Sequence, residues 1–108
     1  MVTKPNPPAI GPVVLTSGIQ QWLADEPHVE TQLKVRLKQF LDGDWGEVNN
    51  SEEDSEQNRK TITRKAGRLM GSYSLIDGRI FWIITDGYGQ QKLGADFCHT
   101  TLLLPDEY

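Results

Sequence analysis

The spacing of apolar positions along the chain changes near residue 67, from a helical period to a strand period. Over residues 16–66, apolar side chains recur every three or four positions, as on one face of an α-helix. Over residues 67–108 they alternate or form short runs bounded by glycine and proline, which is typical of β-strands. This order, helices first and strands second, predicts an α+β domain.

The first half of the chain predicts a helical hairpin. Thr16 or Ser17 can cap a helix that ends at Asp25, because Pro27 disfavours the α conformation in the residue before it. A second helix ends near Gly43, whose lack of a side chain suits the left-handed residue after a helix. One apolar stripe marks this second helix; it consists of Val29, Leu33, Leu37, Phe40 and Leu41.

A third helix is predicted from Ser51 to Lys65, with almost no apolar face. Acidic residues lie in its first turn and basic residues in its last turns, an order that the helix dipole favours. We interpret its charges as a solvated face. Between the second and third helices, Trp45 stands between two glycines and is interpreted as a packing residue at a sharp turn.

The second half of the chain predicts a three-stranded antiparallel meander. Its strands cover residues 68–76, 79–86 and 98–104, and Asp77-Gly78 is a strong hairpin signal between the first two. The predicted fold is therefore α+β, an N-terminal helical hairpin plus a third helix packed on this meander. One core is expected from Leu33, Leu37, Leu41, Trp82, Ile84, Leu102 and Leu104.

The last strand, from Cys98 to Leu104, is predicted to be a sheet edge because no further strand follows it. An apolar edge tends to pair with another chain, so it predicts a two-fold homodimer. If the chain covers this edge itself, residues 1–14 are the segment expected to do so.

Size and composition indicate one domain in a reducing compartment. We divide the 108 residues into an extended or disordered proline-rich arm, 1–14, and a single α+β domain, 15–108. A net charge of −4 makes nucleic acid an unfavourable partner. The single cysteine, Cys98, excludes an intramolecular disulfide. Without a membrane-spanning run or a secretory leader, the sequence predicts a cytoplasmic protein.

Catalytic, cofactor and metal motifs do not stand out. His99 is the best candidate for a general acid or base, with His28, Tyr73 and Asp86 as candidate companions. A single histidine at the start of a strand is more often a surface residue. One cysteine and two histidines are too few for a paired zinc motif. We expect no cofactor and no metal, and the sequence favours a non-enzymatic protein while leaving an enzyme open.

The glycine-rich loop over residues 86–96 is long for a connection between neighbouring strands. Loops of this length are usually functional or disordered. The alternative interpretation is a tolerated surface insertion. Amphipathic side chains in the loop suit a protein-binding surface, so the predicted interaction residues are Tyr88, Gln90, Gln91 and Lys92.

Several blocks of the sequence together resemble a family of small bacterial proteins common on plasmids and other mobile elements. Members are often labelled plasmid-related or type I restriction subunits. A methyltransferase subunit needs a doubly wound domain, which 108 residues with this strand pattern cannot hold. The resemblance brings no established activity, and this chain departs from it in the long loop and in the arm. The blocks are 43–46, Glu52-Glu53-Asp54 with Asn58, Gly67-Arg68 with Ser72-Tyr73, Asp77-Gly78 with 82–85, and 100–108.

These observations lead to three functional hypotheses. The first is a non-enzymatic protein-interaction module of a mobile element or accessory genome, which binds a protein partner through the 86–96 loop and the adjacent sheet face. The second rests on an element order that resembles RelE-like toxins: a ribonuclease with His99 as acid, Arg68 as phosphate clamp and Tyr73 as base. The third is an acidic inhibitor of a nucleic-acid enzyme, which uses the acidic start of the third helix.

Overall fold

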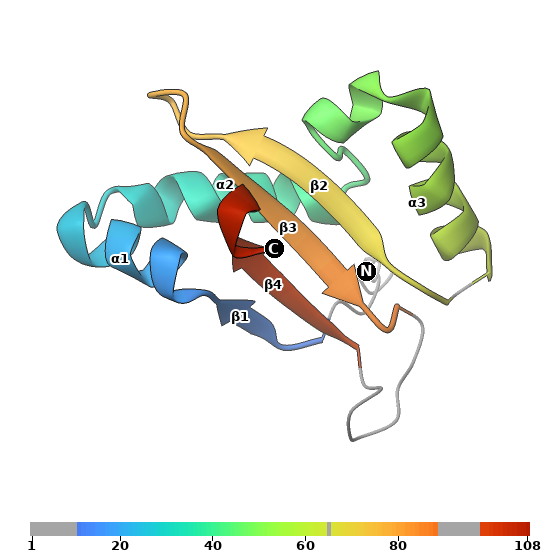
Figure 1. Ribbon diagram of the computed structural model, residues 1–108, viewed down its shortest axis with the longest axis horizontal. Helices are drawn as coiled ribbons and strands as arrows, with labels where there is room; N and C mark the ends of the chain where they lie inside the picture. The colour runs from blue at the N-terminus through green and yellow to red at the C-terminus, as the bar shows by residue number, and fades with distance from the viewer. Residues whose placement is uncertain (1–10, 65, 89–97) are drawn as a thin grey trace, which may run out of the picture.

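The computed structural model describes residues 11–64, 66–88 and 98–108. Over these residues the chain forms three α-helices and a four-stranded mixed sheet, together with two 3-10 turns (Figure 1). The elements are β1 (Val13–Leu15), α1 (Ser17–Asp25), α2 (Val29–Leu41), η1 (Glu47–Asn50), α3 (Glu52–Arg64), β2 (Leu69–Ser74), β3 (Ile80–Asp86), β4 (His99–Leu103) and η2 (Pro105–Glu107).

The predicted antiparallel meander of β2, β3 and β4 is confirmed, but the sheet has a fourth strand. The strand order is β1-β4-β3-β2, and β1 pairs in parallel with β4. The prediction that β4 is a sheet edge was therefore wrong. Val13 and Val14, which the sequence pattern placed in an extended arm, cover that edge together with Leu15. The edge-paired homodimer loses its structural basis at β4.

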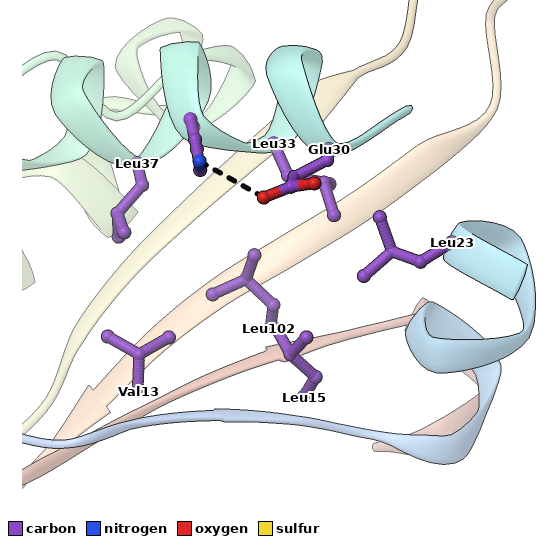
Figure 2. A pocket seen from close by; sticks show the side chains of 8 residues that line it. Val13, Leu15, Leu23, Glu30, Leu33, Leu37 and Leu102 are labelled. Atoms are coloured by element: carbon purple, nitrogen blue, oxygen red, sulfur yellow. Dashed lines mark ion pairs between the residues drawn. The ribbon is translucent and has the colours of Figure 1, made fainter. Parts of the chain in front are cut away.

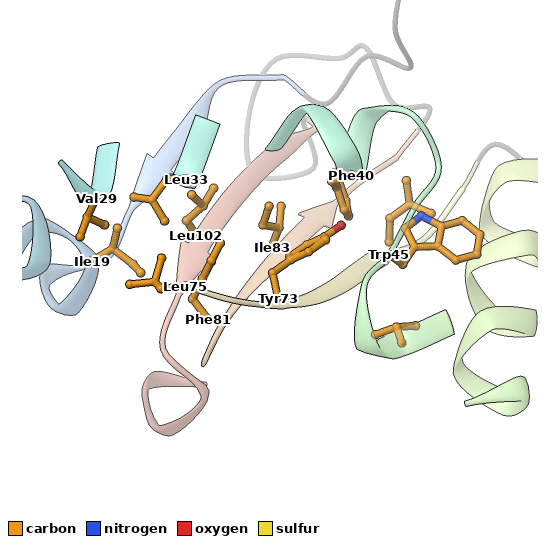
Figure 3. Packing of buried hydrophobic residues seen from close by; sticks show 12 residues of the cluster. Ile19, Val29, Leu33, Phe40, Trp45, Tyr73, Leu75, Phe81, Ile83 and Leu102 are labelled. Atoms are coloured by element: carbon orange, nitrogen blue, oxygen red, sulfur yellow. The ribbon is translucent and has the colours of Figure 1, made fainter. Parts of the chain in front are cut away.

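The helical hairpin packs on one face of the sheet, which we call the inner face. Alternation along the strands sends Leu69, Tyr73, Phe81, Ile83 and Leu102 to this face, where they are at most 5% exposed. Figure 1 shows α2 passing behind the strands, and Figure 3 shows the side chains that fill the layer between helix and sheet. From the helices, the buried contributors are Ile19, Val29, Leu33 and Phe40.

The expected core was partly wrong, because Trp82 and Ile84 lie on the opposite face of the sheet from Leu102. Phe81 and Ile83 occupy the inner positions of β3 instead, and both are fully buried. Leu33 and Leu102 are buried as expected, and Ile84 is also buried, at 3% exposure, although it lies on the other face. Leu37, Leu41, Trp82 and Leu104 are only half-buried. The sequence could not assign a face to β3, because apolar side chains stand at both alternating sets of positions.

α3 closes the β2 edge of the sheet through polar contacts. The Asn58 side chain accepts from the Met70 backbone N–H and donates to the Met70 carbonyl, at 3.0 and 2.8 Å. The Thr61 hydroxyl donates to the Arg68 carbonyl at 2.7 Å. These bonds use backbone groups that an edge strand would otherwise present to solvent.

The turn before η1 approaches the same strand edge at Trp45, which is buried as predicted. The Ser72 backbone N–H donates to the Trp45 carbonyl at 3.1 Å. Gly46 has a φ of 65°, and a Cβ there would lie 2.1 Å from the Ser72 carbonyl oxygen. Any larger residue at position 46 would collide with β2, which explains why glycine follows the tryptophan.

Candidate functional site

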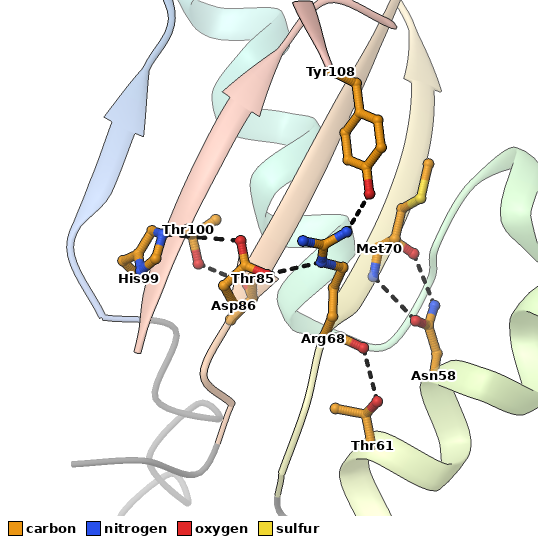
Figure 4. A network of polar contacts seen from close by, with 9 residues as sticks. All are labelled: Asn58, Thr61, Arg68, Met70, Thr85, Asp86, His99, Thr100 and Tyr108. Atoms are coloured by element: carbon orange, nitrogen blue, oxygen red, sulfur yellow. Dashed lines mark hydrogen bonds and ion pairs between the residues drawn. The ribbon is translucent and has the colours of Figure 1, made fainter. Parts of the chain in front are cut away.

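A row of ionisable side chains crosses the face of the sheet opposite α1 and α2, which we call the outer face. Arg68 Nε donates to Asp86 Oδ1 at 2.8 Å, and His99 Nε2 lies 3.9 Å from Asp86 Oδ2 (Figure 4). The register explains this row. Asp86 of β3 is paired with His99 of β4, and Arg68 comes directly before Leu69, which is paired with Thr85.

Arg68 is also held by the last residue of the chain. Its Nη1 donates to the Tyr108 hydroxyl, and its guanidinium lies 5.5 Å from the centre of the Tyr108 ring. The hydrogen bond that Arg68 donates to Asp86 raises the pKa of Arg68 above its usual value, and the hydrogen bond to Tyr108 acts in the same direction. Arg68 therefore presents a fixed positive charge that two neighbours orient.

An aromatic pair continues the site along β3. The Trp82 and Tyr108 rings meet edge to face, with centroids 5.6 Å apart and an interplanar angle of 71°. Trp82 is half-buried, while Tyr108 is 68% exposed. Exposed apolar side chains lie on the same face at Val14 of β1 and Ile80 of β3, each at 50%. The outer face thus combines aromatic, aliphatic and charged groups that solvent can reach.

The strand segments beneath this site are held rigidly. Thr85 and Thr100 point to the inner face and share a buried hydroxyl hydrogen bond of 2.7 Å. This bond joins β3 to β4 one residue before Asp86 and one residue after His99 (Figure 4). On the other side, Asn58 and Thr61 hold β2 next to Arg68. The row therefore stands on backbone that hydrogen bonds hold from two sides.

The structure separates the sequence-predicted site residues into three groups. In the first group, Arg68 and His99 both contact Asp86, which was a candidate companion of His99. Tyr73 does not join them: it lies on the inner face at 2% exposure, and its hydroxyl donates to the Asp44 carbonyl at 2.7 Å. His28 also lies elsewhere, 4.0 Å from Glu26 between α1 and α2.

Of the predicted interaction residues, only Tyr88 can be placed. It is half-buried beside the core, and its backbone N–H donates to the Gly67 carbonyl at 2.9 Å. Gln90, Gln91 and Lys92 lie outside the described residues.

Tyr73 is further removed from acid–base chemistry near neutral pH, because burial of the Tyr73 hydroxyl raises its pKa well above its usual range.

Sequence reasoning missed Trp82 and Tyr108 as surface residues. Trp82 was assigned to the core, and the role of the C-terminal tyrosine depends on a turn that no sequence pattern located. The signal that could have placed Trp82 on the surface was the alternation of side chains between the two faces of a strand. Once Phe81 and Ile83 are placed inward, Trp82 must point to the other face.

Within the described ranges, no three histidine, cysteine, aspartate or glutamate side chains are grouped closely enough to hold a metal ion. Over the same residues, none of the helices has the length and apolar character needed to cross a membrane. Comparisons with protein-family models, with curated proteins and with solved structures find no match to this chain.

Proposed function

We propose that this protein is a non-enzymatic interaction module that binds a protein partner through the outer face of its sheet. The observation that carries the proposal is that Tyr108 contacts both Arg68 and Trp82 on that face. Arginine, tryptophan and tyrosine are the residue types most enriched among energetically dominant interface positions. Here Tyr108 contacts both of the others, and all three side chains remain accessible in part. The resemblance to plasmid proteins is the support for assigning the module, within this proposal, to a mobile element or accessory genome.

The ends of the long loop support the same surface. The 86–96 loop leaves the sheet at Asp86 and returns through Cys98 to His99, and Asp86 and His99 are neighbours in the charged row. A partner seated on Arg68 and Trp82 would therefore meet both ends of this loop. Ile80 and Val14, half exposed, extend the surface along and across the strands. This mixture of apolar and charged groups is typical of reversible protein interfaces.

Affinity capture from a bacterial lysate tests the proposal. An Arg68→Ala/Trp82→Ala variant should lose the partners that the wild-type protein retains, and deletion of residues 87–95 should weaken their capture. Val35→Ala is the matched control, since Val35 is 58% exposed on α2 and far from the outer face in the fold. Capture of the same partners by wild type and by the double variant, both folded by circular dichroism, would exclude the outer face.

A ribonuclease remains the second candidate, because Arg68 and His99 converge on one carboxylate at Asp86. His99 would act as the acid and Arg68 would bind phosphate. Tyr73 cannot be the base of such a site, since it faces the core. Expression in a bacterial host and an assay for ribosome-dependent messenger cleavage test this function. Equal growth and equal messenger stability with wild type and His99→Ala would reject it.

A further inference from the structure

A cavity of about 200 Å³ lies between α2 and the β1 end of the sheet. It is on the inner side of the sheet, so it is separate from the Arg68–Trp82–Tyr108 surface. Figure 2 shows its lining side chains converging from four elements: β1, α1, α2 and β4. The walls are aliphatic and consist of Val13, Leu15, Leu23, Leu33, Leu37 and Leu102.

The cavity follows from the way the elements meet. Leu33 and Leu37 are one helical turn apart on α2, so they form one wall. Leu15 of β1 is paired with Leu102 of β4, and these two side chains form the floor. Val13, two positions earlier on the same side of β1, is 42% exposed and stands at the open end. Branched side chains from four elements leave a space that none of them fills.

The rim of the cavity carries one ion pair. Lys34 Nζ lies 3.0 Å from Glu30 Oε1, and both side chains are exposed, at 74% and 62%. Together they offer a hydrogen-bond donor and an acceptor at the same edge of an apolar space. A ligand head group that both accepts and donates, such as a hydroxyl or a primary amide, can use both. The pair carries no net charge, so it offers an ionised head group no net attraction to offset the hydration that the group loses beside an apolar wall.

We propose that this cavity binds a small aliphatic molecule with a neutral head group, an alkyl alcohol or alkyl amide. The size fits such a ligand: an apolar cavity of about 150 Å³ holds one benzene, so this one suits a chain of about six to eight carbons. The alkyl chain contacts the leucine walls, and the head group lies beside the Glu30–Lys34 ion pair. The site is independent of the proposed protein interface, and neither depends on the other.

Ligand titration followed by methyl and amide NMR of the full chain tests the proposal, with 1-hexanol, hexanamide, hexanoate and hexylammonium as probes. We expect the two neutral probes to shift the methyl signals of Leu33, Leu37 and Leu102. The two ionised probes should bind about tenfold more weakly, because an ionised head group loses hydration at the apolar space and the Glu30–Lys34 pair, which has no net charge, does not compensate for that loss. No localised methyl shift with any probe would overturn the proposal, and so would equal affinity for all four.

Cavity-filling variants provide the second arm. Leu37→Phe should abolish hexanol binding, and Leu23→Phe fills the cavity from α1 if the first variant does not fold. Val35→Phe adds the same ring on the exposed side of α2 and should bind hexanol like the wild type. Lys34→Met should retain hexanol but lose the discrimination against hexylammonium. Hexanol binding that survives both filling variants, or that fails equally in Val35→Phe, would show that the cavity is not the site.

Discussion

The two faces of the sheet use alternate residues of the same strands for different purposes. On the inner face Tyr73, Phe81 and Ile83 are almost completely buried, and the polar atoms there have hydrogen-bond partners. On the outer face Trp82 and Asp86, from the same strand, remain partly accessible and contact an arginine and a C-terminal tyrosine. Adjacent residues of β3 therefore differ in exposure: Phe81 and Ile83 are fully buried on the inner face, whereas on the outer face Ile84 is buried and Trp82 and Asp86 are partly accessible.

Truncating one residue from each face of β3 should give the largest difference in unfolding free energy. Phe81→Ala should cost about 3–5 kcal/mol of unfolding free energy, because it empties a fully buried position that contacts Trp22 and Tyr73. Trp82→Ala, at the next position, should cost clearly less, since the ring is only half-buried. Denaturation by urea measures both. Equal losses for the two variants would mean that the outer face is also a structural core.

Leu37→Ala should have the next largest effect. The residue is half-buried and already borders a cavity, so its truncation enlarges an existing space. We expect a loss of about 2 kcal/mol, at the low end of the range for leucine in a core. Leu33→Ala, at a 5% exposed position one turn away, is the matched comparison and should cost more. If Leu37→Ala leaves the unfolding free energy nearly unchanged, the Leu37 side chain does not stabilise the fold by packing at the cavity wall.

Local signals predicted most of the fold. Pro27 and Gly43 bounded the helices, and Asp77-Gly78 located the hairpin of β2 and β3, because each of these residues restricts or permits particular backbone angles. The parallel strand β1 was not predicted as a strand, although residues 1–14 were named as the segment that would cover the edge if the chain did so itself. It has three residues, and its pairing with β4 is a contact between the two ends of the chain. Local patterns carry no information about such a long-range pairing.

The candidate site was harder to predict than the fold. His99, Asp86 and Arg68 were recognised as ionisable residues near strand ends, but their convergence depends on the register between three strands. Register follows from which face is buried, and the continuous apolar run of β3 left that undecided. Tyr108 joins the site only through the fold of the C-terminal turn. The sequence identified the ionisable side chains of the site, but only the structure showed which of them contact one another.

A smaller change in stability is expected at β2, the strand at one edge of the sheet. Asn58→Ala removes the side chain that donates to and accepts from the Met70 backbone. We expect a loss of about 1–3 kcal/mol, because these backbone groups lose their partners. Asn58→Asp keeps the acceptor and removes the donor, so it should be intermediate. Light scattering should also show more self-association of Asn58→Ala through the uncovered edge, and an unchanged mass would mean that α3 still covers it.

The smallest expected effect lies at Glu107, which links the helix layer to the outer face. Its Oε1 accepts from the Thr16 hydroxyl at 2.6 Å and from the Leu104 N–H at 2.8 Å, while Oε2 accepts from the Gly18 N–H in the first turn of α1. The adjacent Tyr108 reaches Trp82 and Arg68 on the outer face. One carboxylate thus fastens the turn that positions the aromatic pair.

The pH dependence of stability should reveal this link. The Thr16 hydroxyl, followed by the Leu104 N–H, lowers the pKa of Glu107 below its usual 4.5. A carboxyl with a lowered pKa in the folded state contributes its stabilisation above the unfolded value and loses it as the pH falls through the folded value. Glu107→Gln should therefore be slightly less stable than the wild type near neutral pH, and the difference should shrink below pH 4.5. Urea denaturation of both proteins across this range measures it. Thr16→Val, which keeps the carboxylate but removes its closest donor, should shrink the same difference at neutral pH. If the wild type remains more stable than Glu107→Gln by the same amount in strong acid, the effect comes from packing of the turn. The charge of Glu107 would then not contribute to the link between the helices and the outer face.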